Sequence, residues 1–374
     1  MARRRDFSFR LFIRYPHSSY QKSAYRIPSG LSLVELLIVI GIILVLLAMF
    51  FMTTARNVRG PARRTTCANN LRQIGLAMHN YESAHQKIPM AIGIRNEAGQ
   101  LQPNRISGFV AMLPMMEQNN LYDLIVNPSE FNNVKYPAYG PKFSDQSYPP
   151  WTESIPGFEC PSDYATGPFG RTNYAFSIGD TARQIYQPNK LRGPFGAFKN
   201  ATFSDITDGT ANTIALAEMG GPQIDSIRGG FLTEGKPEWL DSPGKVFSEV
   251  NKRKDKYKSS KGLGGRGSHW ADGSAGIGLI NTILPPGSPS FRVAGNQNGD
   301  GVYSVGSAHE GGANVVMADD STHFISNNID SGKRNNPTLT VEQIESEAGA
   351  GSPHGVWGAM GSMAGGEVVK EFEY

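Results

Sequence analysis

The pattern of apolar positions begins with one long run near the N-terminus. Residues 36–52 carry no charge and no proline, which is about 26 Å of helix, or about 33 Å when counted from residue 31. This length is close to the hydrocarbon thickness of a bilayer, so the run predicts a transmembrane helix. Glu35 lies near its start. An acid in such a segment is costly, and we interpret it as functional; the alternative is a plain membrane anchor whose Glu35 reaches back to the interface.

A second helical pattern follows the apolar run. Residues 60–61, a Gly-Pro pair, predict a kink or interruption of the helix. Beyond it, four apolar residues fall on one helical face and predict an amphipathic helix packed on a sheet. These residues are Leu71, Ile74, Met78 and Tyr81.

The rest of the chain alternates short apolar segments with turn signals. The clearest hairpin lies at residues 311–326, with its turn at Asp319, Asp320 and Ser321. With 43 Gly and 24 Pro, the chain is richer in turn residues than a helical bundle. The predicted fold is α+β: residues 1–30 as a leader, 31–89 as a transmembrane and spine helix, and 90–374 as a loop-rich, mainly antiparallel β domain.

Charge changes this picture only at the N-terminus. The first 30 residues hold seven basic residues and one acidic residue, so the rest of the chain has a net charge of about −3 despite the overall +3. The basic leader therefore gives no indication of nucleic-acid binding. It favours a cytoplasmic N-terminus and an exported body. A cleaved secretory signal is the competing reading, although the run is longer than a signal core and ends in a poor cleavage site.

The sequence GLSLVE at residues 30–35 resembles the processing motif of type IV prepilins and type II secretion pseudopilins. In those proteins a prepilin peptidase cleaves after the Gly and methylates the new N-terminus, and the fifth mature residue, Glu, pairs with the N-terminal amine of a neighbouring subunit. The resemblance implies Gly30 as the last leader residue, Leu31 as the mature N-terminus and Glu35 as the assembly residue. The usual first mature residue is Phe, and Leu31 departs from it.

Two cysteines, Cys67 and Cys160, are present. An exported body would allow them to pair, and the alternative is two buried thiols. We predict a disulfide that joins the amphipathic helix to the body.

A second resemblance covers nearly the whole chain after the leader. Segments such as CANNLRQIGLAMHNYESAHQKIP, DITDGTANTIALAE and SAHEGGANVVMADDSTHFIS resemble a large bacterial family of unknown function with a prepilin-type N-terminus and a His-x9-Asp-Gly motif. His309 and Asp319 fit that spacing, and Asp320 stands at the Gly position. We expect the hairpin to survive this departure, because Asp tolerates turn conformations.

Candidate chemistry is sparse. We expect the hairpin to bring His309 near Asp319 in a structural contact rather than an acid/base pair, because no nucleophile elbow, phosphate loop or HExxH motif accompanies them. The seven His include no i, i+4 helical pair, which argues against zinc. The predicted class is therefore not an enzyme.

The sequence GNQNGDGVYS at residues 295–304 is the candidate metal loop. Asn296, Asn298 and Asp300 alternate as in a calcium loop, but Ser307 stands where such a loop has Glu. The alternative is an ordinary turn rich in Asn and Gly.

Together these observations predict a membrane-anchored pilin-like or pseudopilin subunit, a minor or tip component of a type II secretion or type IV pilus-like assembly. Its expected partners are the prepilin peptidase, other pilin-like subunits and membrane lipid. Its expected location is the inner membrane, with one span and the C-terminal domain outside the cytoplasm, or a cell-surface filament. The rival is a tethered module that binds a glycan or peptide and does not polymerise.

Overall fold

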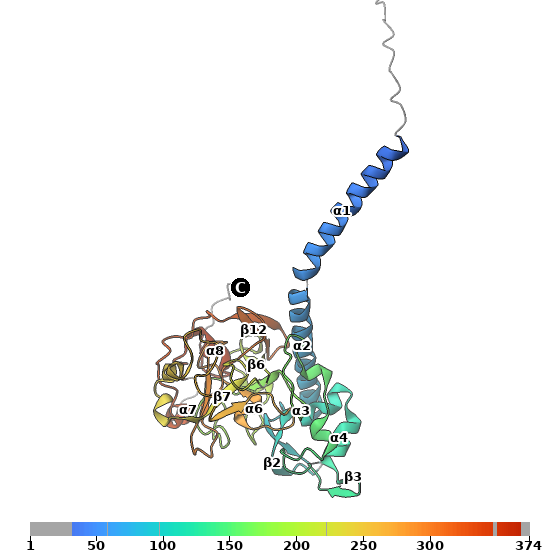
Figure 1. The fold of residues 1–374 in the computed structure, drawn as a ribbon. Helices are drawn as coiled ribbons and strands as arrows, with labels where there is room; N and C mark the ends of the chain where they lie inside the picture. The colour runs from blue at the N-terminus through green and yellow to red at the C-terminus, as the bar shows by residue number, and fades with distance from the viewer. Residues whose placement is uncertain (1–31, 58, 97, 222, 347–349, 368–374) are drawn as a thin grey trace, which may run out of the picture. The chain divides into compact units, whose positions relative to one another are not determined.

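The structure is a computed structural model that describes residues 32–57, 59–96, 98–221, 223–346 and 350–367 (Figure 1). The chain divides between Asn57 and Val58 into two units. The first contains helix α1, and the second contains all other described elements. The leader, with Gly30 and Leu31, lies outside the described residues.

Helices of very different length make up the α part. The α-helices are α1 Leu33–Asn57, α2 Arg59–His85, α3 Gly108–Met112, α4 Asn119–Val126, α5 Pro149–Thr152, α6 Ala275–Gly278, α7 Val341–Ser346 and α8 Gly355–Gly361. The 3₁₀ helices are η1 Leu113–Met116, η2 Pro156–Phe158, η3 Phe203–Asp205, η4 Thr210–Asn212, η5 Pro237–Trp239 and η6 Pro243–Glu249.

Helix α1 begins with a reciprocal cap. The Ser32 amide donates to Glu35 Oε2 at 2.8 Å, and the Glu35 amide donates to Ser32 Oγ at 3.2 Å. This is the capping-box arrangement of Ser followed three residues later by Glu, and it satisfies two backbone N–H groups that a helix start otherwise leaves free. Glu35 therefore caps the start of α1, a role that the sequence analysis did not predict.

The predicted transmembrane helix is wrong. Among the residues that the structure describes, no helix is both long enough and apolar enough to cross a membrane. The uncharged apolar side chains described in α1, from Leu36 to Met49, cover only about 21 Å of helix against the ~30 Å of a hydrocarbon core.

Helix α2 forms one wall of the second unit. Of the predicted apolar face, Leu71, Ile74 and Met78 are fully buried and Tyr81 is half-buried; Cys67, one turn before Leu71, is also fully buried. This stripe packs against β12, β6 and the 3₁₀ helices η1 and η2 (Figure 1). Helix α2 is thus part of the core of the body.

Two larger sheets and two hairpins make up the β part, which is mainly antiparallel as predicted. Among the named strands, β5 with β9 and β7 with β10 pair in parallel. The five-stranded sheet runs in the order β13 Thr322–Ser326, β12 Gly312–Met317, β6 Ile214–Glu218, β5 Tyr174–Ser177 and β9 Leu279–Ile280. The four-stranded sheet runs β11 Gly301–Val302, β10 Ser290–Val293, β7 Gly230–Gly235 and β8 Leu263–Gly265. The hairpins are β1 Ile92–Arg95 with β2 Leu101–Ser107, and β3 Ser129–Phe131 with β4 Val134–Tyr136.

The predicted hairpin at residues 311–326 is confirmed as β12 and β13, which pair from Gly312 with Ser326 to Val316 with Thr322. In its turn, Asp320 has a φ of 70°, the left-handed region that favours glycine. The Asp320 carboxylate accepts a hydrogen bond from Arg72 of α2 at 3.4 Å. Asp thus replaces Gly at a position where the backbone suits Gly, and it gains a contact to the helix.

Gly75 allows α2 to approach this hairpin closely. A Cβ at this position would meet Asp320 Oδ1 and would lie 3.0 Å from Val316 Cγ1. We therefore predict that Gly75→Ala lowers the free energy of unfolding by about 1–3 kcal/mol through overpacking. At an exposed helix position, alanine normally stabilises a protein relative to glycine by about 1 kcal/mol. A loss of stability in Gly75→Ala would therefore indicate a clash at this position.

Two variants control this prediction, with chemical denaturation as the measurement. Gly60→Ala, in the same helix but with open space around it, should not destabilise the protein. In an Asp320→Gly background the cost of Gly75→Ala should fall, because one of the two clashing groups is gone. An equal cost of Gly75→Ala in both backgrounds would contradict the packing described here.

Two buried histidines make stability depend on pH. Burial lowers the pKa of His269 to about 4, although a backbone hydrogen bond at Phe143 opposes the shift, and burial also lowers the pKa of His354 to about 4. Between about pH 6.5 and 4 the unfolded chain binds protons at these positions that the folded chain does not. Stability is therefore full above pH 6.5 and is lost as the pH falls toward 4.

We predict a slope of up to about 2.7 kcal/mol per pH unit from the two groups, since one pKa unit corresponds to 1.36 kcal/mol for each. Denaturant unfolding between pH 7 and 5 measures this slope above the range in which most carboxylates titrate. His354→Gln should halve the slope, and His85→Gln, at an exposed position, should leave it unchanged. A flat stability profile in this window would contradict the burial of neutral imidazoles.

Candidate functional site

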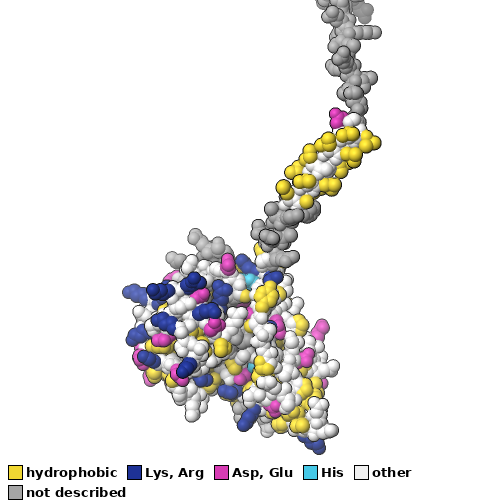
Figure 2. All heavy atoms as spheres, in the orientation of Figure 1, with side chains coloured by type: hydrophobic (Ala, Val, Ile, Leu, Met, Phe, Trp, Pro, Cys, Tyr) yellow, Lys and Arg dark blue, Asp and Glu magenta, His cyan; other side chains and the backbone are white. Residues whose placement is uncertain are grey.

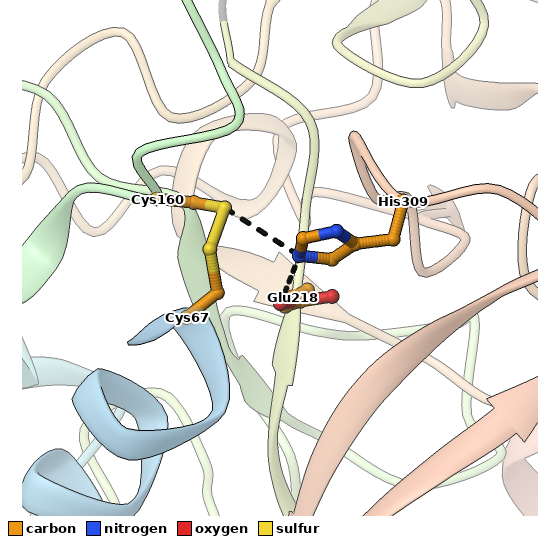
Figure 3. Close-up of side chains that lie close together, drawn as sticks. All are labelled: Cys67, Cys160, Glu218 and His309. Atoms are coloured by element: carbon orange, nitrogen blue, oxygen red, sulfur yellow. Dashed lines mark hydrogen bonds and ion pairs between the residues drawn. A yellow bond between two sulfur atoms is a disulfide. The ribbon is translucent and has the colours of Figure 1, made fainter. Parts of the chain in front are cut away.

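Four segments that are far apart in the sequence meet beside the central strands of the five-stranded sheet (Figure 3). Helix α2 supplies Cys67, the loop after η2 supplies Cys160, the end of β6 supplies Glu218, and the loop before β12 supplies His309. One sulfur, nitrogen or oxygen atom from each residue lies within 4.8 Å of those of the others. We call these four residues the Cys–Glu–His cluster.

Glu218 is the buried acid of the cluster. It is the last residue of β6, and only 2% of its surface is exposed. Its Oε2 accepts hydrogen bonds from Ser307 Oγ at 2.8 Å and from the Asn314 amide at 2.9 Å, and its Oε1 accepts one from Asn314 Nδ2 at 2.8 Å. Donors from β12 and the loop before it therefore satisfy a carboxylate that would be costly to bury alone.

His309 connects this carboxylate to the sulfur atoms. Its Nε2 lies 3.4 Å from Glu218 Oε1 and 3.7 Å from Cys160 Sγ (Figure 3). Its amide donates to Ser307 Oγ at 3.0 Å, and the same hydroxyl donates to Glu218. Ser307 thus positions both the acid and the imidazole.

The cysteines form a disulfide that attaches α2 to the body. The Cα atoms of Cys67 and Cys160 are 5.0 Å apart, and both residues are buried. Next to the disulfide, the Tyr174 hydroxyl donates to the Cys67 carbonyl at 3.0 Å. Burial, followed by the negative charge of Glu218, holds the pKa of Tyr174 well above its usual value. The phenol stays protonated and keeps this hydrogen bond.

The structure does not bring His309 and Asp319 together. Asp319 lies in the turn between β12 and β13, where its Oδ1 accepts hydrogen bonds from the Ser321 amide at 2.9 Å and from Ser321 Oγ at 2.6 Å. His309 instead faces Glu218. The two motif residues therefore serve different parts of the same sheet, one a turn and the other the Cys–Glu–His cluster.

The candidate calcium loop is closed by its own hydrogen bonds. Asn296 Oδ1 accepts from the Asn298 amide at 2.7 Å, and Asn296 Nδ2 donates to Asp300 Oδ2 at 2.9 Å. The Gln184 amide donates to Asp300 Oδ1 at 2.6 Å, and burial raises the pKa of Asp300. Asn296 Oδ1 and both Asp300 carboxylate oxygens thus already accept protein N–H groups, and calcium binding stays a prediction.

Sequence reasoning missed Glu218 and its partners Ser307 and Asn314. The available signal was an acid directly after the apolar stretch IALA in a strand with no exposed face. A charge at the end of such a strand indicates a buried partner. The identity of that partner could not be read from spacing, because His309 is about 90 residues away.

The fold and the cluster define an α+β body in which one buried disulfide joins a long helix to the loop after η2. Residues 56–332, most of the chain, match the family described as "Protein of unknown function (DUF1559)", and the chain belongs to this family. The predicted membership of a family of unknown function is confirmed. The match begins after the residues that resemble a prepilin motif. No curated protein and no solved structure matches the chain.

The disulfide should contribute strongly to stability. With a sequence separation of 93, it restricts the unfolded chain by an amount equivalent to about 4–5 kcal/mol in the chain-entropy model. We predict that the double variant Cys67→Ala/Cys160→Ala loses stability of this order relative to the oxidised protein. Denaturant unfolding in the presence of a chelator measures the loss.

The reduced wild-type protein is the matched control, because it should unfold close to the double variant. Non-reducing peptide mapping should recover the Cys67 and Cys160 peptides joined. Complete alkylation of both thiols in protein isolated from outside the cytoplasm would contradict the assignment.

Proposed function

We propose that this protein is a pilin-like structural subunit that assembles with other subunits through α1. The observation that carries the proposal is the exposure of this helix. Its large apolar side chains between Leu33 and Met49 are 44–73% exposed, and they occupy nearly every position of this stretch and so all sides of the helix. Figure 2 shows one apolar face of α1. A helix that is apolar all round is normally buried in its working state.

The body does not need α1 for its own core. The buried apolar residues belong to α2, the sheets and the loops of the second unit. Identical helices of neighbouring subunits would offer a matching surface for the apolar side chains of α1. Packing of such helices would bury most of the apolar area of each.

Glu35 would then serve two purposes. In the single chain it caps α1 through Ser32. In the assembly, we propose that its charge pairs with the N-terminal amine of a neighbouring subunit, which a prepilin peptidase frees by cleavage between Gly30 and Leu31. A carboxylate among apolar helices is stable when a cation meets it, so this ion pair would also fix the axial register of the subunits.

The disulfide supports a location of the body outside the cytoplasm, where such bonds form and persist. A secretion pseudopilus or a short type IV pilus-like fibre is the corresponding kind of assembly. The proposal assigns the chain a structural role and no catalysis.

A cleft in the body favours the second candidate, a module that binds a glycan or peptide without polymerising. The cleft has a volume of about 740 Å³, within the range of ligand sites. Phe169 stacks on His269 there at 4.8 Å between ring centres, and Tyr139 and Phe143 line the same space. Aromatic faces of this kind can stack on sugar rings.

Substitutions at Glu35 separate its two purposes. Glu35→Gln keeps a side chain that can cap α1 but removes the charge, whereas Glu35→Val removes both. We predict that both variants lose incorporation into crosslinked assemblies, while only Glu35→Val weakens the start of α1, by about 1 kcal/mol. Chemical crosslinking of cell fractions, with mass spectrometry of the mature N-terminus, measures assembly and cleavage together.

The pattern of results is decisive. Assembly by Glu35→Gln at the native level, with loss only in Glu35→Val, would show that capping matters and the ion pair does not. Native assembly by both variants would overturn the pilin-like mechanism and favour the binding module. Cleavage after Gly30 should be preserved in both, so that loss of assembly cannot be attributed to processing.

A further inference from the structure

We propose that the reduced form of this protein binds one zinc ion through Cys67, Cys160, Glu218 and His309, and that the disulfide excludes the metal. The cluster would thus hold α2 in two ways. Zinc would connect α2 to the loop after η2 and to the sheet while the cysteines are thiolates, and the S–S bond connects α2 to that loop after oxidation.

The donor set is that of a structural zinc site. Zinc prefers four ligands in a tetrahedron, drawn from thiolate sulfur, imidazole nitrogen and carboxylate oxygen. The cluster offers two sulfurs, one nitrogen and one oxygen within 4.8 Å of one another, and all four residues are largely buried. His309 Nε2 already points toward both Cys160 Sγ and Glu218 (Figure 3).

The electrostatics also favour a cation. Within the described part of the chain, no Lys or Arg forms an ion pair with Glu218, whose partners are the neutral donors of Ser307 and Asn314 and the imidazole of His309. Reduction would add two thiols that can ionise beside this carboxylate. The two thiolates and the Glu218 carboxylate would together carry three negative charges. A divalent cation would reduce this to a net charge of −1, which the Ser307 and Asn314 donors would stabilise.

The ligands are held by contacts that do not depend on the disulfide. Asn314 and Ser307 orient Glu218, and the Cys160 amide donates to Asn173 Oδ1 at 2.8 Å. Asn173 Nδ2 in turn donates to Asp163 Oδ2 at 2.8 Å. Hydrogen bonds behind the ligands of this kind strongly influence metal affinity, and here they exist before any metal binds.

The conversion of the disulfide form into the zinc-bound form balances in atoms and electrons. A dithiol reductant transfers two electrons and two protons to the Cys67–Cys160 disulfide, which opens to two thiols while the reductant becomes a cyclic disulfide. Zinc then displaces the two thiol protons. The sulfurs must separate to about 3.8 Å, the spacing that Zn–S bonds of about 2.3 Å require in a tetrahedron.

The sequence analysis argued against zinc because the seven histidines include no i, i+4 helical pair. The four residues come from separate segments, and only the fold brings them together. This also explains why the site needs an intact body rather than a peptide.

The test uses the full chain in oxidised and reduced form, with Zn²⁺ as titrant and Co²⁺ as a spectroscopic probe. The reduced protein should bind one Zn²⁺ per chain and unfold at a higher temperature with zinc than with a chelator. Its Co²⁺ form should show a sulfur-to-cobalt charge-transfer band and the intense visible bands of tetrahedral coordination. The oxidised protein should show neither effect.

His309→Gln keeps both cysteines, and its oxidised form serves as the control for folding. Once reduced, it should bind zinc at least about tenfold more weakly than the wild type. His85→Gln, which removes a histidine remote from the cluster, should bind normally. The proposal is overturned if the reduced wild type binds no zinc, if reduced His309→Gln binds equally well, or if the cobalt spectrum lacks the sulfur band.

Discussion

The burial of the Glu218 carboxylate is the constraint around which the body is organised. A charge at the end of a fully buried strand requires hydrogen-bond donors, and Asn314 and Ser307 provide them from β12 and the loop before it. This places His309 against the same carboxylate, and Cys160 of the disulfide beside the imidazole. One buried charge and one covalent bond thus hold α2, β6 and β12 in register, in a chain otherwise rich in loops.

The two units of the chain differ in whether their apolar residues are buried or exposed. The body buries its apolar residues in its own core and surrounds the Glu218 carboxylate with hydrogen-bond donors. Helix α1 does the reverse, because it exposes apolar side chains from Leu33 to Met49, and its capped start carries Glu35. The same chain therefore combines a domain with its own buried core and a helix whose apolar side chains are exposed. This contrast is the physical basis for assigning a role in assembly.

Local patterns predicted local structure well. The buried stripe of α2 followed from helical spacing, and the β12–β13 hairpin followed from alternation around a turn, with Asp320 in a glycine-like conformation as its motif position implied. The length of the apolar run was a poorer guide and led to a transmembrane prediction that is wrong. The sequence predicted that Cys67 pairs with Cys160, but not that Glu218 and His309 lie beside the disulfide, because no sequence periodicity links these distant segments.

Cysteine crosslinking within α1 tests the central claim, assembly through this helix, most directly. The sequence has only two cysteines, which the disulfide pairs, so Leu44→Cys adds the single reactive thiol. Mild oxidation in cells should give a disulfide-linked dimer with Leu44→Cys, and far less with Leu44→Cys in a Glu35→Gln background or with Ser248→Cys on the exposed surface of the body. Only monomer from Leu44→Cys, or equal dimer from Ser248→Cys, would contradict the account.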